Sequence, residues 1–161
     1  MNILKNPYAG LPGYNCFGCS PSNPAGLKMQ FREEGGEVVS EWEPAGNFQG
    51  FHDILHGGIQ ATMMDEISSW YVFARMDTAG VTSRLTVRYR KPVHLSAGTI
   101  TLRAGLKEQR RNMAIIGVSL RDGNGDLCSE GELEYFLLSP EKAREKMHYP
   151  GREGFTAGSE F

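Results

Sequence analysis

The sequence predicts an α+β domain in which a mostly antiparallel sheet of about six strands wraps around one long buried helix. Two observations support this prediction. Between Gly57 and Ala74, apolar residues recur at intervals of three and four, the spacing that lines one face of a helix. Much of the remaining chain alternates apolar and polar residues over short runs separated by turn-forming residues, which is typical of half-buried strands.

The elements follow in order from these patterns. Alternation predicts a first strand over residues 27–32, which the Gly35-Gly36 turn joins to a second strand over residues 37–43. After the helix, the same alternation predicts four further strands, at residues 82–93, 100–107, 113–121 and 127–137. A short helix should follow at residues 139–149, because Pro140 suits the first turn of a helix.

Composition places limits on domain count and partners. The 161 residues suffice for one domain with a sizeable core, which we assign to residues 1–150, followed by a flexible polar tail at residues 151–161. The 17 basic and 19 acidic side chains give a net charge of −2, whereas nucleic-acid-binding proteins usually show a basic excess. No signal peptide and no run of about 18 apolar residues is present. We therefore expect a cytoplasmic location, with no nucleic-acid or membrane partner.

His56-Gly57-Gly58 directly precedes the long helix. The first backbone N–H groups of a helix lack partners within it, and glycines without side chains allow another molecule to approach closely. The turn therefore predicts an oxyanion site, with Gly57 and Gly58 as its backbone. A histidine just before a helix is commonly a structural hydrogen-bonding residue, so we expect His56 to support the turn.

Asp65 lies in the same predicted helix, about 12 Å along the axis from Gly57 at 1.5 Å per residue. Its carboxylate cannot reach a small group held at the Gly57 amide of its own helix. In a homodimer with two antiparallel helices, however, each Asp65 would face the partner's glycine turn. Spacing alone fits a solvent-facing Asp65 equally well, although the apolar surroundings favour the first interpretation. Glu66 is a rival acid that lies about 100° around the helix.

Several motifs follow one another along the chain. They are Cys16-Phe17-Gly18-Cys19, Asn23-Pro24-Ala25-Gly26-Leu27, Phe48-Gln49-Gly50, His56-Gly57-Gly58 with Asp65, and the strand Thr82–Val93. In this order they resemble the PaaI-type acyl-CoA thioesterases of the hotdog-fold superfamily, over residues 16–138. The resemblance implies the hotdog fold, hydrolysis of acyl-CoA or another acyl thioester, and a homodimer that could pair into a dimer of dimers.

The resemblance also implies roles for individual residues. Gly57 of one subunit would hold the thioester oxygen, and Asp65 of the other would act as nucleophile or as the base that activates water. In similar enzymes a Ser or Thr near Ser83 assists this water, although a hydroxyl bonded to strand-end backbone is an equal alternative. Related proteins carry an asparagine where this chain has Gly50, so Gln49 becomes the candidate for a substrate contact in this loop.

Arg90 and Lys91 lie near the end of the predicted strand at residues 82–93, which carries several cationic side chains. They are candidates for binding the phosphates of coenzyme A. The alternative is a solvated face, paired across the sheet with Glu130, Glu132 and Glu134.

Cys16 and Cys19 form the only CxxC, and no second CxxC or paired histidines supply further zinc ligands at the usual spacing. We therefore expect free thiols, no metal and no cofactor.

Two other functions stay open at this point. A noncatalytic acyl-CoA-binding protein would share the fold and the ligand. A hotdog dehydratase or hydratase would need a catalytic histidine paired with an acid inside its own motif, a pattern that is not evident here. Acyl chain length, aromatic character and the choice between coenzyme A and acyl-carrier protein are not specified by the sequence.

Overall fold

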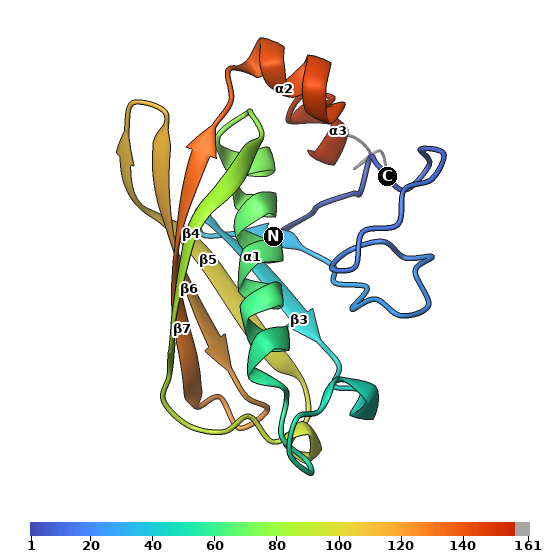
Figure 1. Ribbon diagram of the computed structural model, residues 1–161, viewed down its shortest axis with the longest axis vertical. Coiled ribbons are helices and arrows are strands. Elements are labelled where there is room, and N and C mark those ends of the chain that lie inside the picture. Colours follow the sequence, from blue (N-terminus) through green and yellow to red (C-terminus); the bar gives the residue numbers. More distant parts are fainter. Residues whose placement is uncertain (157–161) are drawn as a thin grey trace.

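The computed structural model describes residues 1–156 of the chain, which form a curved antiparallel sheet with one long helix, α1, packed along its inner face (Figure 1). Within these residues the sheet has seven strands in the order β1-β2-β3-β5-β6-β7-β4. The strands are β1 (Asn2–Ile3), β2 (Arg32–Glu34), β3 (Glu37–Trp42), β4 (Gly80–Tyr89), β5 (Ile100–Arg110), β6 (Met113–Arg121) and β7 (Leu127–Leu137). The helices are α1 (Gly57–Arg75), α2 (Pro140–Met147) and α3 (Glu153–Thr156), with 3-10 turns at Gly46–Phe48 and Leu95–Ala97.

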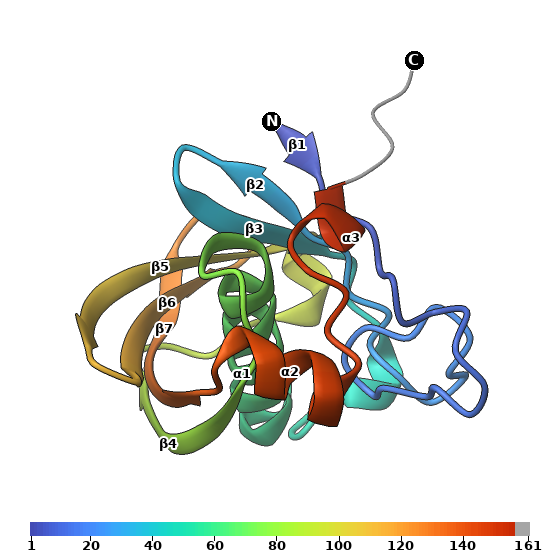
Figure 2. The same cartoon turned by 90° about the horizontal axis from the view of Figure 1, so that it is seen from above.

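The predicted helix stripe forms the centre of the core. Met63, Ile67 and Ala74 of α1 are fully buried against the inner face of the sheet. Leu102 on β5 and Leu133 on β7 are buried on the sheet side of the same core. Figure 2 shows the sheet curving around α1, and the α+β class predicted from the sequence is confirmed.

The first hairpin differs in part from the prediction. Gly35 and Gly36, with φ of +60° and +87°, form the expected turn between β2 and β3. Residues 27–31 are not a strand, however, although Leu27 and Met29 are buried as the alternation required. Their backbone N–H groups donate to carbonyls of the N-terminal loop, and so they are not used in a strand ladder.

Strand β4 lies at the outer edge of the sheet, where it pairs only with β7 among the described strands. Its backbone carries a bulge at Ser83, because Thr82 lies opposite Tyr135 while Arg84 lies opposite the adjacent Glu134. Apolar side chains of β4 remain exposed, including Leu85 at 37%. This edge is therefore open to a further strand.

The C-terminal segment packs over the end of α1 (Figure 2). Ser139 caps α2, with Pro140 in the first turn as predicted. We expected a flexible tail from residue 151, but Phe155 in α3 is fully buried and stacks on Phe73. Apolar burial thus orders the chain to Thr156, whereas residues 157–161 lie outside the described part.

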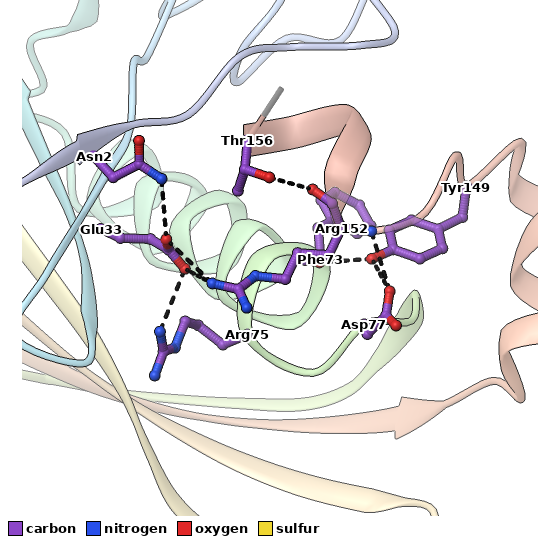
Figure 3. A network of polar contacts seen from close by, with 8 residues as sticks. All are labelled: Asn2, Glu33, Phe73, Arg75, Asp77, Tyr149, Arg152 and Thr156. Atoms are coloured by element: carbon purple, nitrogen blue, oxygen red, sulfur yellow. Dashed lines mark hydrogen bonds and ion pairs between the residues drawn. The ribbon is translucent and has the colours of Figure 1, made fainter. Parts of the chain in front are cut away.

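Polar contacts also bind this segment to the rest of the fold (Figure 3). The Arg152 N–H donates to Asp77, 3.1 Å away, in the turn after α1. Its guanidinium lies 3.3 Å from Glu33 on β2, which also pairs with Arg75 of α1. These contacts connect the last helix with both the sheet and α1. None of the helices within residues 1–156 combines the length and apolar character needed to cross a bilayer.

Candidate active site

The glycine turn forms the N-terminus of α1, and its hydrogen bonds leave one donor available. His56 is the N-cap residue, and its Nδ1 accepts from the Gly58 N–H at 2.9 Å. The Gly57 N–H donates to no atom of residues 1–156. His56 therefore holds the turn through its side chain, and Gly57 supplies the one N–H of the pair that a ligand could use.

Tyr89 braces this turn from β4. Its hydroxyl donates to the Gly57 carbonyl at 2.6 Å, and its ring lies where a side chain on Gly57 would come within 3.4 Å. This contact fixes the peptide plane next to the free N–H. Alternation puts Tyr89 among the apolar residues of the strand, and a one-dimensional pattern does not show that β4 passes the helix N-terminus.

Asp65, in the third turn of α1, is held by two hydroxyl groups. Thr82 Oγ1 lies 2.5 Å from Asp65 Oδ1, and Tyr135 Oη lies 2.9 Å from the same oxygen. Tyr135 is almost fully buried, and burial raises the pKa of its phenol, so it stays protonated as a donor. The arrangement fixes one carboxylate oxygen and leaves Oδ2 without a partner among the described residues.

The bulge in β4 decides which hydroxyl reaches Asp65. The resemblance implied that a hydroxyl at or near Ser83 assists the attacking water, with a hydroxyl bonded to backbone as the alternative. In the structure the extra residue in β4 turns Thr82 toward α1, and the Ser83 hydroxyl donates to the Glu134 carbonyl at 3.0 Å. The backbone-bonded alternative thus describes Ser83, and Thr82 is the residue beside the acid.

The loop before the helix forms a surface hollow next to Gly57. Gln49 and Gly50 line it together with Phe51 and His56, around a volume of about 470 Å³. Gln49 Oε1 accepts from the Asp53 N–H at 3.1 Å, so its side chain also holds the loop together. Gln49 and Gly50 nevertheless line the same hollow as Gly57.

Arg90 and Lys91 lie beside a second hollow at Gly57. A hollow of about 370 Å³ is lined by both of them, by Gly57 and by Tyr89. Each cation already has an acidic partner: Arg90 contacts Glu130 at 2.5 Å, and Lys91 contacts Asp126 at 2.7 Å. These are exposed pairs, which an incoming phosphate could displace at low cost.

Glu66 faces away from this site. Its carboxylate accepts from the Trp70 indole N–H at 3.1 Å and lies 3.6 Å from the Cys16 thiol. Burial raises its pKa to about 7. The two neighbouring acids thus occupy different surroundings, and only Asp65 borders β4.

Comparisons with known proteins agree with the fold. The model of the thioesterase superfamily matches residues 52–129, which contain the glycine turn, Asp65 and Thr82. A sequence search against curated proteins gives no match. Many solved structures are similar, among them the PaaI protein of the E. coli phenylacetic acid degradation operon. It is 17% identical with a TM-score of 0.62, over 70% of this chain and 81% of that chain. The chain has the hotdog fold.

Two further structures extend the comparison with this superfamily. A crystal structure described as a thioesterase superfamily protein is 21% identical with a TM-score of 0.66, and the match spans 75% of this chain but only 62% of that chain. A protein from Streptococcus mutans, solved with bound acetyl-CoA, is 18% identical with a TM-score of 0.64, over 81% of this chain and 97% of that chain. The superfamily model leaves out Cys16 and Cys19, which lie N-terminal to the matched residues.

Proposed function

We propose that this protein is an acyl-CoA thioesterase that works as a homodimer, in which Asp65 of one subunit and the Gly57 N–H of the other act on the same thioester. The observation that carries the proposal is that the chain has both a free N–H at the N-terminus of α1 and a carboxylate held by Thr82 and Tyr135. Thioester hydrolysis needs both a donor for the developing oxyanion and a base or nucleophile.

The Gly57 donor suits the electrophilic half of the reaction. The thioester carbonyl oxygen becomes negative as the nucleophile attacks, and the aligned dipoles of the 19-residue α1 favour negative charge at this end. His56 and Tyr89 hold the turn from both sides and cannot compete for the Gly57 N–H. The donor is therefore positioned before substrate arrives.

Asp65 suits the nucleophilic half of the reaction. If it acts as general base, it takes the proton from the water that attacks the carbonyl carbon, and the coenzyme A thiolate leaves as the carbon–sulfur bond breaks. If it acts as nucleophile, the carboxylate itself attacks the carbonyl carbon, the coenzyme A thiolate leaves as the carbon–sulfur bond breaks, and water then hydrolyses the resulting mixed anhydride. In either case the free Oδ2 is the reacting oxygen, since Thr82 and Tyr135 bind Oδ1.

The homodimer is required by distance and supported by the open sheet edge. Gly57 and Asp65 are separated by about 12 Å along one helix axis, so the two groups must come from different subunits. Strand β4 borders both groups, through Tyr89 at Gly57 and Thr82 at Asp65, and its outer edge is unpaired within the described sheet. A second copy docked along β4 would bring two such sites together.

Coenzyme A is the proposed carrier. The Streptococcus mutans structure with acetyl-CoA supports this choice, as does the hollow that connects Gly57 with Arg90 and Lys91. Gln49 and Gly50, which line the neighbouring hollow, would border the acyl thioester, together with Gly58 next to Gly57. We place the enzyme in the cytoplasm, where its three free cysteines would stay reduced.

A hydrolysis screen tests the proposal. The purified protein would be assayed with short, long and aryl acyl-CoAs, and release of free coenzyme A would be followed for wild type, Asp65→Asn and the exposed control Glu145→Gln. We expect Asp65→Asn to lower kcat by about 10²- to 10⁴-fold with unchanged mass and melting temperature, and Glu145→Gln to match wild type.

Two results would count against the proposal. Full turnover by Asp65→Asn would remove this residue from the mechanism. Tight acyl-CoA binding by wild type without hydrolysis of any substrate class would show a noncatalytic binding protein instead.

A further inference from the structure

A second cluster of reactive side chains lies outside the proposed active site. Cys16 and Cys19 in the N-terminal loop and Glu66 on α1 bring their sulfur and carboxylate atoms within 4.8 Å of one another. The CxxC spacing shows only two possible ligands, because the third comes from a residue 50 positions further along the chain. The fold therefore supplies a third ligand that the spacing does not show.

The loop is shaped around the carboxylate. A Cβ atom on Gly18 would lie 2.5 Å from the Glu66 carboxylate carbon, so a larger residue here would require the Glu66 side chain to shift. The loop backbone is fixed by two hydrogen bonds, from the Leu27 N–H to the Phe17 carbonyl at 2.8 Å and from the Met29 N–H to the Gly18 carbonyl at 2.9 Å. The two thiols are thus held against α1 by a defined backbone.

No cationic side chain of the described residues forms an ion pair with the carboxylate of this cluster. Glu66 is mostly buried and forms no ion pair with any lysine, arginine or histidine of residues 1–156. Its partners are the Trp70 N–H and the Cys16 thiol, and Cys19 lies 3.0 Å from the Tyr14 hydroxyl. Buried carboxylates and thiolates are normally paired with a cation or bound to a metal.

The distances fit one particular class of cation. The Cys16 sulfur lies 3.6 Å from each Glu66 carboxylate oxygen. In a tetrahedral zinc site the edge between a sulfur and an oxygen ligand is about 3.5 Å, given typical bonds of about 2.3 and 2.0 Å. Two thiolates with one carboxylate favour a borderline-soft ion such as Zn²⁺ over the hard ions Ca²⁺ and Mg²⁺.

We propose that Cys16, Cys19 and Glu66 bind one divalent cation of the zinc class. The three protein ligands leave one coordination position, which faces a cavity of about 350 Å³ lined by the same residues and by aromatic side chains. The bound ion joins the N-terminal loop to α1 at the residue next to Asp65. Removing the ion should therefore loosen this loop, because the cluster is one of the attachments between the loop and the helix.

Cobalt is the probe for the test, since Co²⁺ occupies zinc sites and its thiolate complexes absorb light. Full-length protein, purified with reductant and freed of metal, would be titrated with Co²⁺ and then with Zn²⁺. Metal content would be measured on protein purified without chelator. We expect one Co²⁺ per chain with a thiolate-to-cobalt absorption band, displacement by Zn²⁺, and a higher melting temperature with metal.

Matched variants assign the ligands. Cys16→Ser and Cys19→Ser should lose the absorption band, and Glu66→Gln should bind at least tenfold more weakly. Cys128→Ser removes a buried thiol elsewhere and should behave as wild type. Because titration of wild type needs no variant to fold, the test holds even if a substitution destabilises the chain.

Three outcomes would overturn the site. One is wild-type protein with three titratable thiols that takes up no stoichiometric Co²⁺. Another is equal binding by wild type and Cys16→Ser. The third is a Cys16–Cys19 disulfide that persists in the presence of reductant.

Discussion

The Tyr135 hydroxyl on β7 lies 2.9 Å from Oδ1 of Asp65 on α1, inside a core where Tyr135 is only 1% exposed. The same hydroxyl lies 3.0 Å from the Ser69 hydroxyl, one turn further along α1. A buried phenol with fixed partners orients the carboxylate more firmly than a solvent-exposed group could. Several expectations about activity follow from this contact and its neighbours.

Replacing Tyr135 by phenylalanine removes that hydroxyl and keeps the ring. We expect kcat to fall by about 10- to 100-fold, because Asp65 keeps only its contact with Thr82, and misplaced reacting groups cost rates of this order. Tyr149→Phe is the matched control, since Tyr149 is also buried and its hydroxyl donates to the Phe73 carbonyl at 2.7 Å, away from Asp65. Steady-state kinetics and thermal melts of both variants give the comparison. Equal losses of activity would show a general effect of packing.

The bulge in β4 predicts different results for two adjacent hydroxyl residues. Thr82→Val removes the donor at 2.5 Å from Asp65 and should lower kcat by about tenfold or more. Ser83→Ala removes only a bond to the Glu134 carbonyl and should leave kcat within about twofold, with a stability cost of about 1 kcal/mol. Steady-state kinetics of the two single variants test this prediction. A larger loss of kcat from Ser83→Ala than from Thr82→Val would contradict the assignment of Thr82 as the residue beside Asp65.

Substitutions of His56 distinguish a structural role of this residue from a catalytic one. Its Nδ1 caps α1 through the Gly58 N–H, so His56→Ala should destabilise the protein by about 1 kcal/mol, measured by denaturant unfolding. His56→Asn offers a side-chain oxygen that suits the same N-cap position and should regain most of the stability and activity. A His56→Asn protein that is stable but inactive would instead assign His56 a direct role in the chemistry.

The sequence predicted the elements whose patterns are local. The α1 stripe, the Gly35-Gly36 turn and the helix start at Pro140 each depend on neighbouring residues, and all three are confirmed. Two-residue β1 was missed because so short a strand has no alternation to detect. Residues 27–31 misled the analysis because burial against the core produces the same alternation as a strand.

The site was predictable only in part, for a related reason. The glycine turn and Asp65 belong to one helix and to motifs with fixed spacing. Thr82 and Tyr135 reach Asp65 through sheet register, and a single inserted residue in β4 changes which hydroxyl faces the helix. The contact between Cys16 and Glu66 is likewise a tertiary one, and no spacing rule could have shown it.

Phe155 tests whether α3 is part of the folded domain. It is fully buried and packs against Trp70, Phe73 and Tyr149, so Phe155→Ala should cost about 3 kcal/mol or more. Phe136→Ala provides the control, because Phe136 is 42% exposed and its truncation leaves no buried cavity. Urea unfolding of both variants would be compared. Similar small losses would mean that α3 contributes little to the core.

The homodimer can be tested at the edge of β4. Leu85 is 37% exposed there, and the proposed partner would cover it, so Leu85→Glu would bury an unpaired charge in the interface. We expect a shift from dimer to monomer in light scattering, together with loss of hydrolysis, because each site needs Gly57 of one subunit and Asp65 of the other.

Leu106→Glu is the matched control for this interface. Leu106 is similarly exposed, at 41%, but lies on β5 away from the β4 edge. This variant should stay dimeric and active. Mixing Gly57→Pro subunits, which lack the oxyanion donor, with Asp65→Asn subunits would sharpen the test, since a heterodimer retains one intact site. Activity regained on mixing requires residues from two chains, whereas a fully active Leu85→Glu monomer would contradict the shared site.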